Sequence, residues 1–136
     1  MKKTYMDARR WLKQYKLVEK ELKSRLEYAE EFKKILLHPL AVEEVALNKI
    51  YRSVVDYMEK KSEFLKNRLK EIEEVIELLP AEEKAVIYHR YIVGVSWIDM
   101  PEYIMYEQRT CQLYEMSALK KIAKMNIDWE GKKIER

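Results

Sequence analysis

The stretch that decides the fold runs from Leu79 to Ile122 and reads LPAEEKAVIYHRYIVGVSWIDMPEYIMYEQRTCQLYEMSALKKI. Pro80 suits the first turn of a helix, and the acids Glu82 and Glu83 that follow complement the partial positive charge at a helix N-terminus. Gly94 is the residue best suited to the left-handed backbone that commonly ends a helix. The stretch therefore opens with a helix predicted from about residue 80 to residue 93.

Two further helices are predicted after Gly94. Ser96 can cap a second helix, and Asp99 three residues later makes a variant of the capping box. A tight turn at residues 105–106 leads to a third helix from about residue 107 to residue 124. Apolar residues recur at steps of three and four, which predicts one buried face. These residues are Val86, Ile87, Tyr91, Ile92, Met100, Tyr103, Ile104, Cys111, Tyr114, Ala118, Leu119 and Ile122. Three short helices with this punctuation are typical of a helix-turn-helix, which presents one helix to the major groove of DNA.

Polar side chains occupy the opposite face of the third helix, near its start. Arginine pairs bidentately with guanine and glutamine with adenine, so this chemistry fits the recognition of bases. Other side chains there could hold phosphates. The predicted DNA-binding residues are Gln108, Arg109, Thr110, Gln112, Lys120 and Lys121. The same residues equally suit an ordinary solvated helix face, so the pattern leaves both interpretations open.

Two long helices are predicted upstream, from about residue 4 to 37 and from about residue 40 to 78. Each carries apolar residues at alternating steps of four and three, which is the seam of a coiled coil. The predicted dimer or partner seam comprises Trp11, Tyr15, Val18, Leu22, Val55, Met58, Leu65 and Leu69. The simpler interpretation, which we favour for Trp11, Tyr15 and Phe32, is that they are core residues. His38-Pro39 interrupts the pattern, and so short a connection favours antiparallel packing.

The sequence as a whole predicts an all-α protein with three parts. These are a coiled-coil-like hairpin (1–78), a three-helix helix-turn-helix unit (79–125) and a polar tail (126–136) in which the role of Trp129 stays open. Strand signals are lacking, since there is no sustained period-two alternation. A two-helix hairpin leaves much of each apolar stripe in water, so we expect a partner, and a homodimer is the default because symmetric dimers are the commonest assembly.

The charge of the chain limits the choice of function. The formal net charge is +3, and residues 1–37 carry eleven Lys and Arg against six Asp and Glu. Residues 80–136 carry nine of each sign, so the predicted DNA-reading unit is neutral and has little unspecific attraction for phosphates. The single cysteine, Cys111, allows no disulfide within the chain, and no metal-ligand set surrounds it. No apolar run approaches membrane-spanning length, so we expect a cytoplasmic protein without cofactor or metal.

The stretch from Leu79 to Ile122 resembles region four of bacterial sigma factors. It is more closely similar to the ArpU/RinA-like transcriptional regulators of phages and prophages. The resemblance spans roughly forty-four residues without a gap, and the charged hairpin before it also looks like the N-terminal part of the phage regulators. The residues that carry it are Leu79-Pro80, Glu82-Glu83, Tyr88, Arg90-Tyr91, Gly94, Ser96-Trp97, Asp99, Arg109-Thr110 and Ala118-Leu119-Lys120-Lys121-Ile122.

The resemblance implies a DNA-binding transcriptional regulator of phage or prophage genes, dimerised by its hairpin. A second hypothesis is a protein-interaction module that docks on RNA polymerase with little DNA recognition of its own. A third is a phage packaging or scaffold protein built on the hairpin. We do not expect an enzyme, because neither His38 nor His89 has a Cys, Ser or Asp partner at catalytic spacing.

Overall fold

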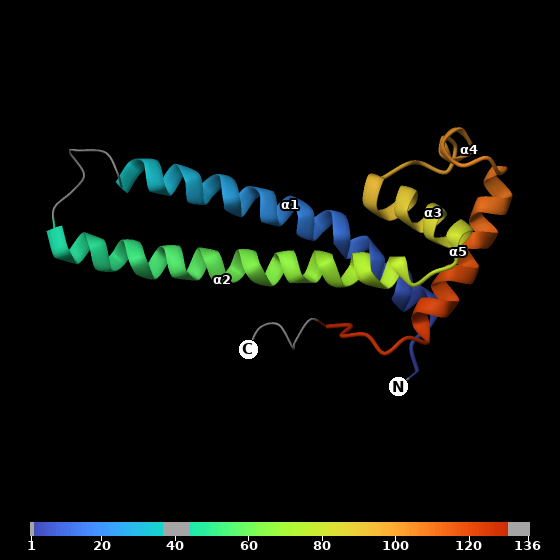
Figure 1. The fold of residues 1–136 in the computed structure, drawn as a ribbon, viewed down its shortest axis with the longest axis horizontal. Helices are drawn as coiled ribbons and strands as arrows, with labels where there is room; N and C mark the ends of the chain where they lie inside the picture. The colour runs from blue at the N-terminus through green and yellow to red at the C-terminus, as the bar shows by residue number, and fades with distance from the viewer. Residues whose placement is uncertain (1, 37–43, 131–136) are drawn as a thin grey trace.

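The structure, a computed structural model, describes residues 2–36 and 44–130 (Figure 1). Every element in these two ranges is helical and none is a strand, which confirms the predicted all-α fold. The elements are α1 (Tyr5–Leu36), α2 (Glu44–Glu77), α3 (Ala81–Ile87), the π-helical turn η1 (Tyr88–Val93), α4 (Met100–Tyr103) and α5 (Gln108–Ala123). The predicted break at His38-Pro39 lies outside the described residues.

The two long helices run antiparallel, and the shorter helices gather at one end of this hairpin (Figure 1). α1 begins with a capping box: the Thr4 backbone N–H donates to Asp7 Oδ2 at 2.8 Å, and the Asp7 N–H donates to Thr4 Oγ1 at 3.4 Å. This arrangement satisfies two amides that a helix start otherwise leaves unpaired. The backbone bond from Thr4 holds the pKa of the Asp7 carboxyl below its usual value.

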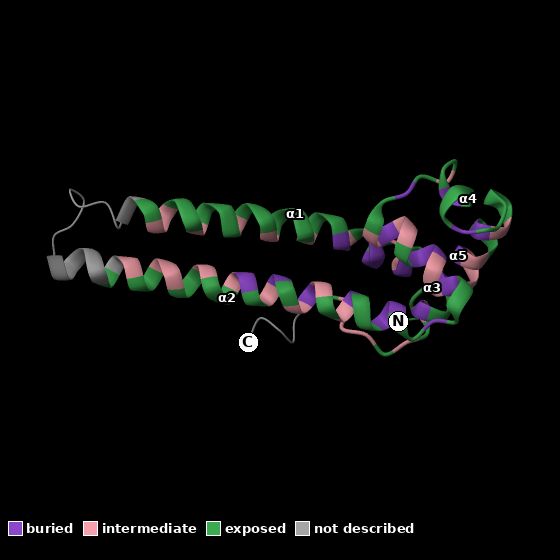
Figure 2. Ribbon diagram, turned by 45° about the horizontal axis from the view of Figure 1, so that its top comes forward, coloured by how far each residue is buried: buried purple, intermediate pink, exposed green. Residues whose placement is uncertain are grey.

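The hairpin has two halves that differ in burial. The proximal half (residues 5–18 and 62–77) joins the C-terminal helices, and the distal half (residues 19–34 and 49–61) extends away from them (Figure 2). Buried side chains lie in the proximal half, whereas the described side chains of the distal half are half-buried or exposed. The hairpin therefore buries its apolar stripe fully only where a third layer covers it.

The main core is shared between the proximal half and the C-terminal helices. It contains Ala8, Trp11, Leu12, Tyr15, Ile72, Val75, Ile76, Leu79, Ile87, Tyr91, Ala118, Leu119 and Ile122. The sequence predicted a boundary between the hairpin and the C-terminal unit (residues 79–125) after residue 78, but this core contains residues from both sides of that boundary. The hairpin and the C-terminal unit consequently form one packed body at this end.

A second, smaller core lies inside the C-terminal unit. It consists of Val86, Val95, Met100, Ile104 and Cys111. Burial here matches the predicted face at four of these residues, and Val95 joins them from the turn after Gly94. Tyr103 was expected to be buried with them, but this expectation is wrong, because 57% of its surface is exposed.

The second helix of this unit is shorter than the sequence suggested. It was expected to open at Ser96, but residues 97–99 form a turn and α4 begins at Met100. The Ser96 Oγ accepts from the Asp99 N–H at 3.2 Å, but this bond lies within the turn, and α4 itself has no side-chain cap bond. Pro101 occupies one of the first positions of α4. Proline is tolerated in a first turn, so the helix starts late instead of bending around the ring.

The helix that ends at Gly94 changes from α to π geometry after Ile87. The His89 ring lies within hydrogen-bonding distance of the Ala85 carbonyl, with Nδ1 2.7 Å from the oxygen. That carbonyl is the normal α-helical acceptor for the His89 N–H, so the ring enters the hydrogen-bond ladder and widens the turn. Gly94 then ends the helix with φ 93°, as predicted.

Residues 126–130 of the tail lie against the hairpin. Arg68, which is buried, donates to the carbonyls of Asp128 at 2.7 Å and Trp129 at 2.8 Å. The Trp129 ring packs edge-on against Trp11, with ring centroids 5.7 Å apart. The role left open for Trp129 is therefore internal packing, and this part of the tail is tied to the proximal half.

Candidate DNA-binding site

The face of α5 opposite its core contacts begins at the end of the molecule farthest from the distal half (Figure 1). Cys111, Ala118 and Leu119 anchor the buried side of α5 and have no exposed surface. Glu107 precedes the helix with extended backbone and makes no side-chain cap bond to it. The first turn of α5 thus keeps amide groups available to a partner.

The predicted DNA-binding residues fall on different sides of α5. Gln108, Arg109 and Gln112 are exposed at its start. Thr110 is half-buried, and Lys121 donates to the buried carboxylate of Glu83 at 2.6 Å. Lys120 is exposed farther along the helix. The three residues predicted to recognise bases therefore lie together, whereas Lys121 is already engaged within the protein.

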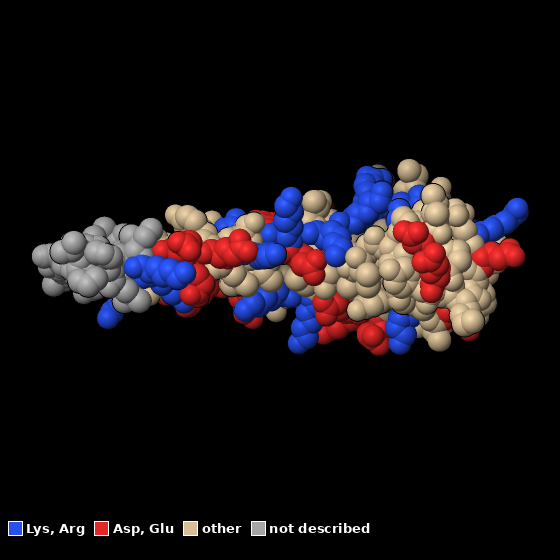
Figure 3. All heavy atoms as spheres, turned by 90° about the horizontal axis from the view of Figure 1, so that it is seen from above, with Lys and Arg blue, Asp and Glu red and all other residues tan. Residues whose placement is uncertain are grey.

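A groove of about 380 Å³ borders Gln112, between α1, η1 and α5. It is lined by Arg9, Lys13, Arg90, Tyr91, Trp97, Gln112, Glu115 and Met116. Three of these residues are cations and one is a carboxylate, which leaves an excess of two positive charges. Figure 3 shows lysine and arginine side chains along the hairpin up to the C-terminal unit, with acidic side chains between them.

Glu115 organises the floor of this groove. Its carboxylate is buried and accepts from Arg9 at 3.1 Å and from the Tyr91 hydroxyl at 2.5 Å. Burial, together with the bond to Glu115, raises the pKa of the Tyr91 hydroxyl far above its usual value. Burial by itself would lower the pKa of Arg9, but Glu115 and Tyr91 outweigh it and the pKa is raised. Arg9 therefore stays cationic while its charge is largely balanced by Glu115.

Arg90 and Lys13 supply the less compensated positive charge. Arg90 donates to the Val95 carbonyl at 3.0 Å, and its guanidinium lies over the Trp97 ring, 5.0 Å from the centroid. Neither contact neutralises its charge. Lys13 is exposed and has no ion-pair partner within the described part of the chain. The groove is thus suited to an anion.

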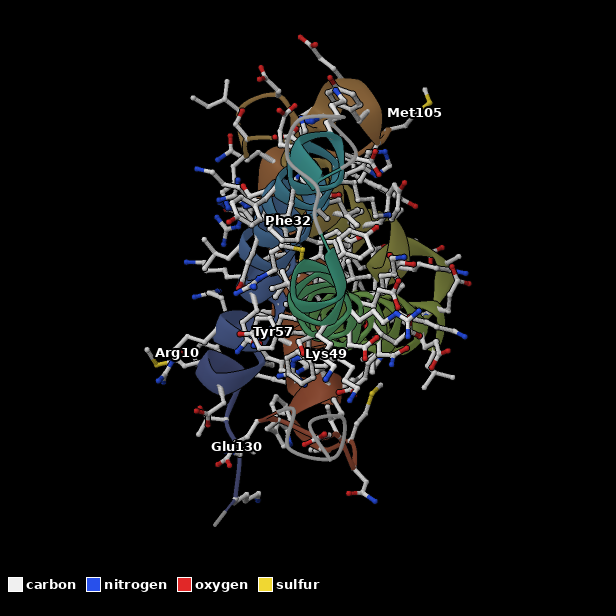
Figure 4. The ribbon with its side chains drawn as sticks, turned by 90° about the vertical axis from the view of Figure 1, so that its left-hand side faces the viewer. Arg10, Phe32, Lys49, Tyr57, Met105 and Glu130 are labelled. Carbon is white, nitrogen blue, oxygen red and sulfur yellow. The ribbon has the colours of Figure 1, made fainter. Side chains whose placement is uncertain are left out.

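Apolar side chains are exposed on the other parts of the C-terminal unit. Figure 4 shows Met105 projecting away from the ribbon, and 96% of its surface is exposed. Ile98 and Leu113 are 82% and 64% exposed, and Leu113 stands on α5 beside Gln112. The acids Asp99 and Glu102 are exposed close by along the chain. These features suit contact with a protein better than contact with phosphates.

The predicted seam residues are divided between the two halves of the hairpin. Trp11, Tyr15 and Leu65 are buried within the chain's own fold. This confirms the interpretation of Trp11 and Tyr15 as core residues, and it leaves little of their surface for a partner. The same expectation is wrong for Phe32, which is only half-buried. Val18, Leu22, Val55, Met58 and Leu69 are half-buried. Val55 and Met58 line an open groove of about 530 Å³ between α1 and α2.

The described residues offer neither a metal centre nor a reactive thiol. They contain no group of three His, Cys, Asp or Glu side chains able to hold a metal ion. The Cys111 thiol is buried, which raises its pKa and makes it a poorer nucleophile. No described helix combines the length and apolar character needed to cross a lipid bilayer.

Comparison with known proteins gave no match. No protein-family model matches the chain, and no curated protein or solved structure shows significant similarity to it. The resemblance to phage regulators therefore rests on the sequence pattern alone.

Sequence reasoning missed the cations that line the groove. Arg9, Lys13, Lys16 and Lys20 follow one another at steps of four, three and four, so their common side of α1 was visible in the sequence. The spacing within α1 does not show that α1 packs against α5, a helix that begins about a hundred residues later in the chain. The contact between Arg9 and Glu115 supplies that link.

Proposed function

We propose that this protein binds double-stranded DNA and regulates transcription, with the start of α5 in the major groove. The observation that carries the proposal is the exposure of Gln108, Arg109 and Gln112 together at the end of the molecule. In the proposed helix-turn-helix, α4 is the first helix and α5 is the second, or recognition, helix. The first residues of a recognition helix are those that reach base edges. The resemblance to ArpU/RinA-like regulators favours phage or prophage genes as the target.

The proposal includes a dimer. The distal half leaves Val55 and Met58 half-buried beside an open groove, and a second copy would cover them. Two linked reading units bind a pair of half-sites much more tightly than one, because the second contact becomes intramolecular. This effect would compensate for the neutral charge of the C-terminal unit.

Selection of duplexes from a random library, followed by fluorescence titration, tests the proposal. Arg109→Ala should lose about 1–3 kcal/mol of discrimination between the selected duplex and a scrambled one, because a bidentate contact to a base disappears. Arg52→Ala is the matched control, since it removes an exposed arginine from the distal half. Two chains per duplex support the dimer, and one chain per duplex contradicts it.

A second candidate function is docking on RNA polymerase. The exposure of Ile98, Met105 and Leu113 favours it, together with the acids near α4. In that case no duplex would be selected, and polymerase subunits would co-purify with the wild-type protein. Leu113→Lys should then abolish co-purification, whereas a DNA-binding protein should tolerate an added cation on this face.

A further inference from the structure

The groove between α1, η1 and α5 has a composition that the proposed reading helix does not require. Two of its cations, Arg9 and Lys13, come from the hairpin, and Arg90 comes from η1. Gln112, one of the three predicted base contacts, forms part of the same wall. The groove and the predicted recognition surface therefore adjoin each other at Gln112.

We propose that this groove binds the phosphate backbone of the DNA whose bases α5 recognises. The hairpin then takes part in DNA binding directly, in addition to any role in dimerisation. This inference rests on the proposed DNA binding and adds the site that holds the sugar–phosphate strand beside the major groove. Phosphate contacts fix the position of a protein on DNA without reading its sequence.

The side chains in the groove differ in how firmly they are held. Arg90 is fixed by the Val95 carbonyl and the Trp97 ring, so little conformational freedom is lost when it meets a phosphate. Arg9 keeps about a third of its side-chain surface exposed while it pairs with Glu115. Lys13 is exposed and needs to break no ion pair within the described residues. Held guanidinium groups beside an exposed lysine are a suitable set for an anionic strand.

The same side of α1 continues the positive charge beyond the groove. Lys16 follows Lys13 by one turn, and its Cε lies 3.5 Å from the point where a Cβ on Gly94 would stand. Its ammonium makes one exposed contact with Glu19, at 3.4 Å, which is weak in water. From Arg9 to Lys16 the helix rises about 10 Å, close to the axial rise of three base pairs.

The location of the groove also explains how a C-terminal unit without net charge could attract DNA. The C-terminal unit contains as many acids as cations and so has little attraction for DNA by itself. The N-terminal segment is the part of the chain with the clearest positive excess. Packing of α1 against α5 brings Arg9 and Lys13 of this segment to the edge of the reading helix, where they can act on phosphates.

The double variant Lys13→Ala/Lys16→Ala tests the proposal in the full-length protein. Neither lysine belongs to the core, so the fold should persist, and circular dichroism would check this. In a plot of log affinity against log salt concentration, the slope should decrease in magnitude by about two, since each phosphate contact contributes about 0.9. The loss should be equal on the selected and the scrambled duplex. Lys49→Ala/Lys60→Ala removes two exposed lysines of the distal half and is the matched control.

Four outcomes separate this site from the proposed function. An unchanged slope in Lys13→Ala/Lys16→Ala, with lost discrimination in Arg109→Ala, overturns the phosphate site and leaves the reading helix in place. A reduced slope with unchanged discrimination in Arg109→Ala supports the phosphate site and removes the assigned base contact. Both changes together support both. Failure of the wild-type protein to bind any duplex overturns both.

A chemical footprint identifies the ligand independently of these variants. Lysine acetylation, measured by mass spectrometry, should decrease at Lys13 and Lys16 when the duplex is bound and stay unchanged at Lys60. Inorganic phosphate at constant ionic strength is the comparison. Protection by phosphate without protection by duplex would assign the groove to a free anion and overturn the proposal.

Discussion

The proximal and distal halves of the hairpin share the same spacing of apolar residues but differ in how deeply these residues are buried. The proximal half buries Trp11, Leu12 and Ile72 almost completely, whereas no described side chain of the distal half is buried. Both halves repeat apolar residues at steps of three and four. The difference is a third layer, because α5 and η1 cover the proximal half alone (Figure 2). A seam in the sequence therefore shows which side of a helix can be buried, but not whether the chain itself buries it.

The largest expected difference between the halves concerns their aromatic residues. Trp11→Ala should lower the free energy of unfolding by about 3–5 kcal/mol, because it empties a fully packed site. Phe32→Ala in the distal half should cost only about 1–2 kcal/mol, because Phe32 is half-buried and stacks on the ring of Tyr51. Urea unfolding of both variants gives the two values. Equal losses would contradict this distinction and would mean that the second copy proposed above covers Phe32 as well as Val55 and Met58.

The next largest effect concerns the attachment of the tail to the proximal half. Arg68→Ala should cost about 2–3 kcal/mol, because the carbonyls of Asp128 and Trp129 lose a charged donor. Hydrogen exchange should also become faster at residues 126–130. Arg52→Ala, an exposed arginine of the distal half, should stay within about 0.5 kcal/mol of the wild type. Unchanged exchange in Arg68→Ala would show that other contacts hold the tail.

The smallest expected effect is a change in the pH dependence of stability, and it concerns the two core tyrosines, Tyr15 and Tyr91. Burial and a bond to a carboxylate, Glu73 for Tyr15 and Glu115 for Tyr91, raise the pKa of both hydroxyls. Their contribution to stability is fully present below the unfolded pKa, near 10, and is lost as the pH rises above it. Tyr91→Phe should therefore reduce the fall of stability above pH 10 by up to about 1.4 kcal/mol per pH unit.

Urea unfolding between pH 8 and pH 11.5 measures this effect. The values at pH 8 are the control, since both tyrosines are neutral there in the folded and the unfolded chain. A slope above pH 10 that is identical in Tyr91→Phe and the wild type would show that the hydroxyl ionises equally in both states.

Much of the fold could be predicted from local rules. The sequence placed α1 at residues 4–37 and α5 from about 107 to 124, within one or two residues of the helices observed. Gly94 marked a helix end because its tolerance of positive φ is a local property of the backbone. α4 was predicted too long because the turn at residues 97–99 satisfies Ser96 and Asp99 without a helix. The error at Tyr103 followed from that extra length.

The candidate site was only partly predictable for a different reason. Gln108, Arg109 and Gln112 share one helix, so their spacing alone placed them together. The groove beside them needs Arg9 and Arg90, which meet only after α1, η1 and α5 have packed. Buried Glu115 decides this geometry. Its spacing from Cys111 and Ala118 places it on the buried face of α5, but acids are so rarely buried that its residue type argued against a place in the core. Local spacing thus predicts a surface on one element, and tertiary packing decides what stands next to it.

The pairing of Arg9 with Glu115 joins positions 106 residues apart, which has a consequence for biosynthesis. A ribosome adds about 5–20 residues per second, so about 5–20 s pass between the emergence of these two partners. During that interval the newly made α1 presents Trp11 and Leu12 to water without their covering helix. The core around Trp11 can be completed only after α5, which supplies Ala118, Leu119 and Ile122, has been synthesised.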